Sequence, residues 1–403
     1  MSKAKTARWE EKREAILDAA ARVLNRTGLS GFRLAEVAKE IGLKRPSIVY
    51  YFANAEELAE ALYARALDQI EDRVTLAQAQ QNARAHIDKL FQLELSHHAD
   101  EREGKAIRRP QLGEVRALSS ERRRKLGTRY RRIIQRVANM LGDDAPRSKL
   151  IERIGPAHIV METLFWLPAW LDEYEPWAFQ QVRETLVDTL TNGVLASPGH
   201  LQTHRLVERP RFRSETIDQD DYLRAASHLI CDYGIRGAAI DRVSAALGVT
   251  KGSFYHHVAQ KNELIEACFA HSQDRLTAIQ KMASERVSPA EERLSSVLTS
   301  IVEIQLSGNF PLLRSSALPA LSADARAKII AQSNRNFRWF ASEIAAGVAA
   351  GALRSFDPHI SAQVIGTAIN AVYDLGRLYG DEIGPDDTAF YRDLLMHGIL
   401  SPR

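Results

Sequence analysis

Apolar residues recur at spacings of three and four along most of the chain. This period matches the 3.6-residue turn of an amphipathic helix, and no strand-like alternation of useful length is present. The pattern predicts an all-α protein. The helices expected in the first half lie at residues 12–27, 55–74, 80–98, 128–141 and 157–171. Those expected in the second half lie at residues 219–233, 261–282, 291–306, 324–350 and 359–379.

The pattern repeats itself once along the chain. Residues 28–58 (GLSGFRLAEVAKEIGLKRPSIVYYFANAEEL) align without a gap to residues 234–264 (GIRGAAIDRVSAALGVTKGSFYHHVAQKNEL). Near the end of each half, Gly193-Val194-Leu195 aligns with Gly398-Ile399-Leu400. A period of about 200 residues indicates a duplicated domain rather than a solenoid repeat. The polar, proline-containing stretch between the halves predicts a linker.

Composition and charge narrow the class of protein without deciding it. Of the 403 residues, 45% are hydrophobic and 26% are charged, which excludes a disordered chain, a collagen-like fibre and a membrane bundle. The charged N-terminus predicts no secretory signal, and two cysteines are too few for a disulfide framework. We therefore expect a cytoplasmic protein with no membrane partner. Residues 1–206 carry 33 Lys and Arg against 28 Asp and Glu, which permits nucleic-acid binding.

Each copy of the repeat predicts three helices joined by glycines. In the first copy these run from about Trp9 to Thr27, from Leu34 to Glu40 and from Arg45 to Phe52, with Gly28 and Gly42 at the turns. Two short helices that are joined by a glycine turn and packed on a longer helix form a helix-turn-helix. The second short helix of such a pair can enter the major groove of DNA.

The repeated residues also resemble a known family. VAKEIGLKRPSIVYYFANAEEL and VSAALGVTKGSFYHHVAQKNEL are similar to the N-terminal DNA-binding domain of TetR (tetracycline-repressor) family transcriptional regulators. The resemblance implies a tandem fusion of two TetR-like units with helix-turn-helix motifs at 33–52 and 239–258. Each unit would then have a DNA-binding head and a helical ligand/dimerisation body. The expected division is head 1 at 10–70, body 1 at 71–196, a linker at 197–215, head 2 at 216–276 and body 2 at 277–403.

The resemblance further implies how the two units pair. Two late helices of each body would form a four-helix bundle, namely 157–172 with 176–195 and 359–379 with 387–400. The chain would then be an intrachain pseudo-dimer with two unlike heads. A homodimer of fused chains with four heads stays open as an alternative. The implied function is a small-molecule-responsive repressor, and the implied levers between head and body are the helices at 55–74 and 261–282.

The motif positions and the basic residues around them define the expected DNA contacts. A double-stranded DNA operator is the expected partner, and basic segments ahead of each motif (Lys3 to Arg13 and Arg205 to Arg213) would position it through its phosphates. The expected DNA-binding residues are Arg33, Lys44, Arg45, Ser47, Tyr50, Tyr51, Thr250, Lys251, Ser253, Tyr255, His256, His257 and Lys261.

Neither copy keeps the whole family pattern. The recognition-helix tyrosine of the family is Tyr255 in the second copy and Val49 in the first. The phosphate-contacting lysine that opens the next helix is Lys261 in the second copy and Ala55 in the first. An alternative hypothesis is therefore an interaction or scaffold protein in which one head, more readily the first, has lost DNA binding.

The remaining motifs favour a binding protein over an enzyme. The chain has no phosphate-binding loop, no HExxH and no nucleophile elbow, so we expect no catalytic residues and no cofactor. The adjacent pairs His97-His98 and His256-His257 point apart on a helix and predict no metal site. The aromatic residues between Phe165 and Phe179 are interpreted as a helix–helix core or interface rather than a ligand cage, and the basic run 121–132 as the exposed face of a helix. An apolar pocket wall in the body would suit an uncharged or aromatic effector.

Overall fold

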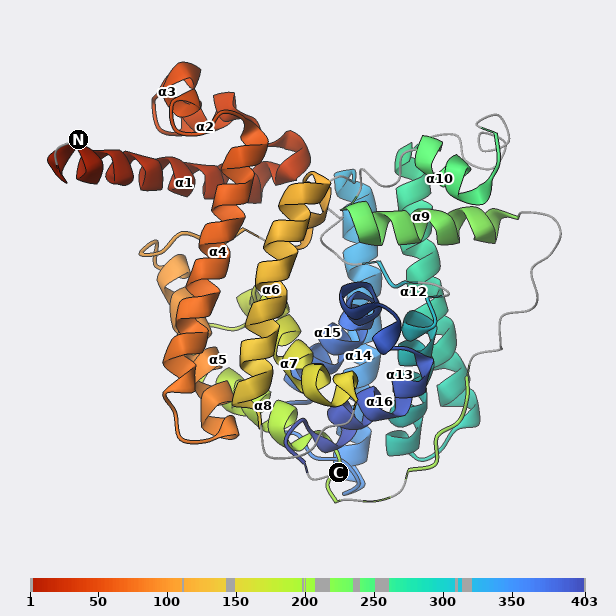
Figure 1. Cartoon of the computed structure of the whole chain (residues 1–403). Helices are drawn as coiled ribbons and strands as arrows, with labels where there is room; N and C mark the ends of the chain where they lie inside the picture. The colour runs from red at the N-terminus through yellow and green to blue at the C-terminus, as the bar shows by residue number, and fades with distance from the viewer. Residues whose placement is uncertain are drawn as a thin grey trace.

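The computed structural model describes residues 3–110, 112–142, 149–197, 199, 201–206, 218–234, 240–250, 261–308, 311–313 and 321–401. Within these residues every regular element is a helix, and one isolated bridge joins Leu195 to Leu353. The predicted all-α class is therefore confirmed. Figure 1 shows the N-terminal helices and the first helices of the second half at one end of the molecule, with most of the other helices below them. No described helix is long and apolar enough to cross a membrane.

The first head has the three helices that the sequence predicts. They are α1 (Lys3–Gly31), α2 (Leu34–Glu40) and α3 (Arg45–Val49). Helix α1 begins at Lys3 rather than near Trp9, so the backbone of the expected N-terminal basic segment is already helical. In the second head the described elements are α9 (Gln219–Tyr233) and α10 (Ile240–Leu247). The predicted recognition helix of this head lies outside the described residues.

Each body continues from a long helix that leaves its head. Helix α4 (Ala55–Gln78) leads from head 1 into body 1, which continues with α5 (Ala83–Arg102), the short η1 (Leu112–Ala117), α6 (Ser120–Met140), α7 (Leu150–Trp166) and α8 (Phe179–Asn192). Helix α12 (Lys261–Arg286) leads from head 2 into body 2, which continues with α13 (Ala290–Leu306), α14 (Ala323–Ala349), α15 (Pro358–Tyr379) and α16 (Thr388–His397). Short 3-10 turns join α7 to α8 and α15 to α16.

Capping side chains explain where helices α4 and α5 begin. The side chains of Asn54 and Asn82 accept hydrogen bonds from the backbone N–H groups of Glu57 and Ala85, which satisfies otherwise unpaired donors in the first turns of α4 and α5.

Helix α6 begins at residue 120 rather than at the predicted 128. Its first half is basic and has few apolar residues, so the sequence shows no helical period there. Those basic residues face α4, where Arg129 pairs with Asp68 and Glu71. The basic run is thus a solvated helix face that also carries inter-helix ion pairs.

The late helices of the two halves pack against each other. Helices α15 and α16 both contact α7 and α8, at the centre of Figure 1. At the end of α8, the N–H groups of Val194 and Leu195 donate to the carbonyl of Met396 over 3.0 and 2.9 Å. In return the N–H of Ile399 donates to the carbonyl of Leu190 over 2.8 Å. The two GVL/GIL repeats found in the sequence therefore meet each other in space.

Glycine is required at this crossing. Gly193 and Gly398 have φ values of 67° and 91°, which L side chains rarely adopt. A Cβ atom on Gly193 would overlap the carbonyl of Met396, and one on Gly398 would overlap the carbonyl of Thr191. The close approach of the two backbones therefore depends on both glycines.

Polar side chains cross the same interface in its buried part. Nδ1 of His158 on α7 lies 3.3 Å from the hydroxyl of Tyr391 on α16, and that hydroxyl donates to the carbonyl of Ala368 on α15. Thr189 on α8 and Ser361 on α15 share a hydrogen bond of 2.8 Å. Because buried polar groups need partners, these bonds specify which helix faces which.

Part of the predicted linker lies on body 2 rather than crossing solvent. The N–H groups of His204 and Leu206 donate to the hydroxyls of Ser296 and Ser300 on α13, and Arg205 pairs with Glu303. Arg205 was expected in the basic segment ahead of the second head, and this ion pair places it on the body instead. Arg209, Arg211 and Arg213 lie outside the described residues.

Candidate nucleic-acid interface and cavity

Helix α3 presents the expected DNA-reading side chains of the first head. Gly42, with a φ of 66°, makes the turn that precedes it, and Pro46 lies in its first turn. Ile48 and Phe52 are buried beneath it. The outward face carries exposed side chains, namely Lys44, Arg45, Ser47, Val49 and Tyr50. Among the residues that the structure describes, neither Lys44 nor Arg45 forms an ion pair. The two cations are therefore available to phosphate or base edges.

The two tyrosines of this head have different environments. Tyr50 is 70% exposed, whereas Tyr51 is half-buried with its ring 5.4 Å from that of Trp9 on α1. The two tyrosine rings also meet edge to face at 5.1 Å. Tyr51 thus ties the end of α3 to α1, and Tyr50 is the better placed of the two to contact a partner.

Arg33 lies beside the helix-turn-helix rather than on α3. It precedes α2, and its guanidinium donates to the backbone carbonyls of Ser30 and Phe32. At the other end of α2, Glu40 pairs with Arg22 and Arg26 of α1, with 3.1 Å between charged atoms in each pair. These guanidinium groups lower the pKa of Glu40. Helix α2 is therefore fixed to α1 at both ends, which holds α3 in place.

The structure describes less of the second head. Helix α10 packs on α9 through buried Val243, and Gly248 repeats the turn of Gly42 with a φ of 70°. Thr250 is exposed directly after this turn. Lys261 is the first residue of α12. The other expected contacts, Lys251, Ser253, Tyr255, His256 and His257, lie outside the described residues.

Body 1 contains a cavity between α4, α5, α6 and α7. Its volume is about 70 Å³, and one side is apolar, with Ala66, Ile70, Leu90, Leu112, Met161, Leu164 and Phe165. The other side is ionic, with Arg73, Glu94, His98, Glu101, Arg108 and Arg109. The cavity was expected to have an apolar lining, but only part of its lining is apolar.

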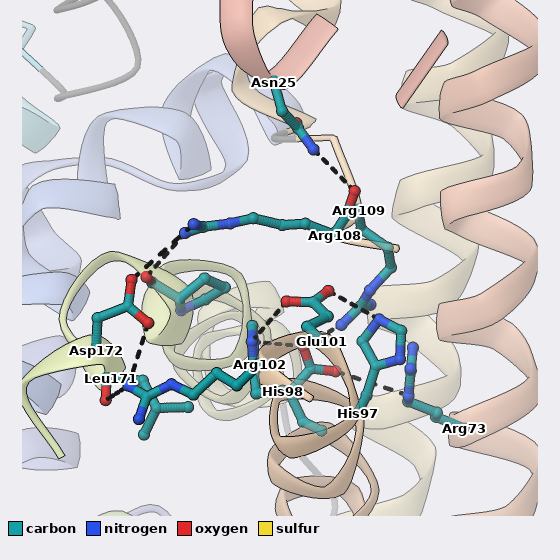
Figure 2. A network of polar contacts seen from close by, with 12 residues as sticks. Asn25, Arg73, His97, His98, Glu101, Arg102, Arg108, Arg109, Leu171 and Asp172 are labelled. Atoms are coloured by element: carbon teal, nitrogen blue, oxygen red, sulfur yellow. Dashed lines mark hydrogen bonds and ion pairs between the residues drawn. The ribbon is translucent and has the colours of Figure 1, made fainter. Parts of the chain in front are cut away.

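The ionic wall is a network centred on Glu94, and Figure 2 shows its members Arg73, His98, Glu101 and Arg109. Its carboxylate, which is almost fully buried, pairs with Arg109 and lies 3.7 Å from Nε of Arg73. His98 reaches Glu94 and Glu101, with its Nδ1 3.0 Å from Oε2 of Glu101. Burial on its own would raise the pKa of Glu94, but Arg109, His98 and Arg73 together lower this pKa to about 2. Glu94 is therefore ionised at neutral pH.

His98 takes part in this network as a partner of two carboxylates rather than as a metal ligand. Burial alone would lower its pKa, but the hydrogen bonds to Glu101 and Glu94 outweigh burial and raise the pKa. Among the described residues no group of three His, Cys, Asp or Glu is arranged to hold a metal ion. The sequence showed His97 and His98 as a pair, and in the structure both lie beside Glu101 of the same helix.

The aromatic residues between Phe165 and Phe179 do not form one core. Phe165 lines the cavity, Trp170 and Phe179 are buried, and Trp177 is 84% exposed. The expectation of a single helix–helix cluster is wrong for Trp177, because it lies in the short 3-10 turn Pro176–Ala178 that joins the helices instead of on a helix face.

Comparisons with known proteins match both heads to one family. The sequence model of the bacterial regulatory proteins of the tetR family matches residues 16–62 and 223–268. Among solved structures, the TetR-family regulator PfmR from Thermus thermophilus is 21% identical, with a TM-score of 0.37 over 44% of this chain and 97% of its own. A TetR-family regulator from Bordetella parapertussis is 18% identical, with a TM-score of 0.39 over 46% and 97%. AibR, in complex with isovaleryl coenzyme A and operator DNA, is 19% identical, with a TM-score of 0.37 over 45% and 98%.

Among proteins of curated function, none matches this chain. The two family matches cover the same helices in each half, namely the long first helix, the helix-turn-helix and the start of the helix that follows. They carry the identification, since they fall on the two copies of the repeat. Both copies of the repeat thus match the sequence model of the bacterial regulatory proteins of the tetR family, in tandem on one chain, which indicates a DNA-binding transcriptional regulator.

Proposed function

We propose that this regulator is a small-molecule-responsive repressor whose two units form a pseudo-dimer within one chain. The observation that carries the proposal is the crossing of the α8 and α16 ends, where each half supplies backbone donors to the other. The buried bond between His158 and Tyr391 adds a side-chain contact specific to this pairing. The proposed division keeps heads at 10–70 and 216–276, bodies at 71–196 and 277–403, and a linker at 197–215.

A pseudo-dimer presents two different reading surfaces to DNA. The first head offers Lys44, Arg45 and Tyr50 on α3, and the second head offers Thr250, while residues 251–260 lie outside the described residues. Since both heads lie at the same end of the molecule, one duplex can contact both (Figure 1). The proposed operator is therefore a pair of unlike half-sites.

The double substitution Lys44→Ala/Arg45→Ala tests the first head. Each lost phosphate contact should reduce the salt slope of DNA binding by about one unit and lower affinity across all sequences. Affinity is measured by fluorescence anisotropy over a range of salt concentrations. Lys281→Ala/Lys328→Ala is the matched control, since it removes the same charge from exposed positions on body 2. An unchanged slope in the first variant would favour the alternative, an interaction protein whose first head no longer binds DNA.

That alternative has one specific observation behind it. Val49 is 42% exposed and Tyr50 is 70% exposed, so α3 carries an apolar patch at the position of the missing family tyrosine. An exposed apolar patch of this kind also suits a protein partner. The two cations beside it, Lys44 and Arg45, make DNA the better-supported partner.

The cavity in body 1 is the proposed effector site. At about 70 Å³ it is smaller than the roughly 300 Å³ of ordinary ligand pockets, so an effector must move part of its wall. Helices α4, α5, α6 and α7 form most of the wall, and the irregular segment that contains Arg108 and Arg109 forms the rest. We propose that this segment moves when the effector binds. An uncharged or aromatic effector remains the prediction, with the added requirement of a polar group to face Glu94 and Arg109.

The described part of body 2 has no matching ionic wall. The buried positions of α13, which corresponds to α5, are apolar residues, serines and Gln305. Asn336 on α14 bonds instead to Gln273 and Thr277 on α12, which fills the space between these helices with paired polar groups. The test of the body-1 site is whether amphipathic small molecules change the operator affinity of the wild-type chain, with the number of molecules bound per chain measured by calorimetry.

The substitution Glu94→Gln tests the ionic wall. It removes the buried carboxylate that pairs with Arg109 and lies beside Arg73, so the free energy of unfolding should fall by about 2 kcal/mol. Urea denaturation followed by circular dichroism measures it. The control is Glu285→Gln, which breaks the exposed pair with Lys281 and should cost less than about 0.5 kcal/mol. Equal losses in the two variants would mean that the network is not buried as described.

A further inference from the structure

One segment of body 1 contacts the cavity, the first head and the second unit. We define the connecting segment as residues 107–110 together with η1 (Leu112–Ala117). Towards the cavity, its Arg109 pairs with Glu94, and Pro110 and Leu112 line the wall. Towards the first head, the carbonyl of Arg108 accepts a hydrogen bond of 2.8 Å from Asn25. The segment therefore joins the proposed effector site to head 1.

A second contact strengthens the link to the first head. The carboxylate of Glu114 on η1 accepts a hydrogen bond of 2.9 Å from the N–H of Leu29, at the end of α1. Burial raises the pKa of Glu114, and this bond to the backbone opposes the rise. Helix α1 is thus bonded to the connecting segment at two places.

The same segment reaches across to the second unit through Arg116. One guanidinium nitrogen donates to the carbonyl of Cys231 over 2.9 Å, and the other lies 2.7 Å from the carboxylate of Asp374. Both side chains of the ion pair are about nine-tenths buried. Cys231 lies in the last turn of α9 in head 2, where helix carbonyls lack partners within the helix, and Asp374 lies on α15. Arg116 therefore joins the end of the second head's first helix to the inter-unit bundle.

Neighbouring contacts restrict the second head further. The guanidinium of Arg123 on α6 lies over the ring of Tyr233 at 4.9 Å, and it also donates to the carbonyl of Asp232. The residue equivalent to Cys231 in the first head is Asn25, which bonds to the connecting segment of its own unit. The second head is contacted by the connecting segment of the other unit, while Sγ of Cys231 also lies 4.0 Å from the carbonyl of Leu312 in its own unit. The coupling that these contacts allow is therefore unequal between the two heads.

We propose that Arg116 is a positioning residue that makes the second head respond to the effector cavity of the first unit. The proposal rests on the proposed effector site. An effector that enlarges the cavity displaces the connecting segment, which shifts α1 through Glu114 and α9 through Arg116. One effector then changes the position of both heads. A guanidinium suits this role because its fork reaches two acceptors on different helices at once.

The experiment measures the distance between the heads without DNA or effector. Spin labels are placed at exposed positions in the full chain, with Glu36→Cys on α2 and Ala246→Cys on α10, and the native Cys231 and Cys268 are buried. The test variant is Arg116→Gln/Asp374→Asn, which removes the contact without leaving a buried carboxylate unpaired. The control is Arg129→Gln, whose ion pairs stay within unit 1. The distance distribution should broaden at least about twofold in the test variant and not in the control.

A second substitution pair perturbs the cavity side of the same link. Glu94→Gln/Arg109→Gln releases the connecting segment from α5 and should shift the mean label distance in the wild-type background. The shift should disappear when Arg116→Gln/Asp374→Asn is also present. A shift that survives, or a distribution unchanged by the loss of Arg116, overturns the proposal. Melting curves verify that each variant is folded.

Two further measurements keep the outcome decisive. Arg116→Lys keeps the charge but cannot bridge both acceptors in the same geometry, so it should give an intermediate width, and a wild-type width would count against the proposal. On the DNA site selected by the wild-type chain, Arg116→Gln/Asp374→Asn should bind roughly 10-fold more weakly, because a less fixed second head has a lower effective concentration at its half-site. If no small molecule alters DNA binding but the label distances behave as stated, the effector proposal fails and the Arg116 link stands.

Discussion

Replacing Gly193 with alanine is expected to lower the free energy of unfolding by about 2–5 kcal/mol, the sum of the left-handed backbone cost and overpacking. Gly193 has a φ of 67°, and an added Cβ would overlap the carbonyl of Met396 and lie 2.5 Å from the nitrogen of Gly398. Neither atom belongs to a flexible side chain, so the two backbones would have to separate. Urea denaturation followed by circular dichroism measures the loss.

The matched control is Gly380→Ala. Gly380 has nearly the same φ, 64°, but no atom lies within 4 Å of the position of its Cβ. This variant isolates the backbone cost, which should be about 1–2 kcal/mol. Equal losses at Gly193 and Gly380 would show that the ends of α8 and α16 do not approach this closely, and the proposed pseudo-dimer would lose its main support.

The preferred DNA site is expected to contain two unlike half-sites in a fixed order. The first head reads with Lys44, Arg45 and Tyr50, and the second would read with Lys251 and His256. Identical heads select palindromes, whereas unlike heads on one chain select different half-sites, about one helical turn apart or a small multiple of it. Unbiased selection from random duplexes identifies the site, and light scattering gives the mass of the free protein, expected to be that of one chain.

Duplicating one half-site into a palindrome should then weaken binding roughly 30- to 700-fold. The estimate takes two lost base contacts at about 1–2 kcal/mol each. The control is a duplex that exchanges bases only between the half-sites. A strictly palindromic selected site together with a dimeric mass would contradict the pseudo-dimer and indicate a homodimer of fused chains with four heads.

The heads show which structural features can be predicted from a few neighbouring residues. Gly28, Gly42 and Gly234 were placed at helix ends and turns from the sequence, and all three have left-handed φ values near 65°. Helix α9 begins and ends at the predicted residues, because Asp218 caps its start and Gly234 follows its end. Such signals act over a few residues, so they are visible without a fold. The start of α1 was missed, because its first turn carries no apolar period.

The ionic wall of the cavity could not be predicted from neighbouring residues alone. The spacing of Glu94, His98 and Glu101 on α5 was readable as one helix face, but their counter-charge Arg109 comes from an irregular segment. No periodicity describes such a segment. Its course depends on how α4, α5, α6 and α7 pack. The ionic wall of the cavity therefore appears only when those helices are in place.

By itself, the sequence determined that this protein is all-helical, is duplicated and has two helix-turn-helix heads. Helical periods and glycine turns can be recognised within short segments, and an internal repeat is found by comparing the sequence with itself. The sequence also showed that Gly193-Val194-Leu195 and Gly398-Ile399-Leu400 are copies of each other. Only the tertiary structure decided that these copies bond to one another and that Arg116 reaches Cys231, 115 residues away. Contacts between distant segments depend on how whole helices pack, and a pattern along the chain does not encode that packing position by position.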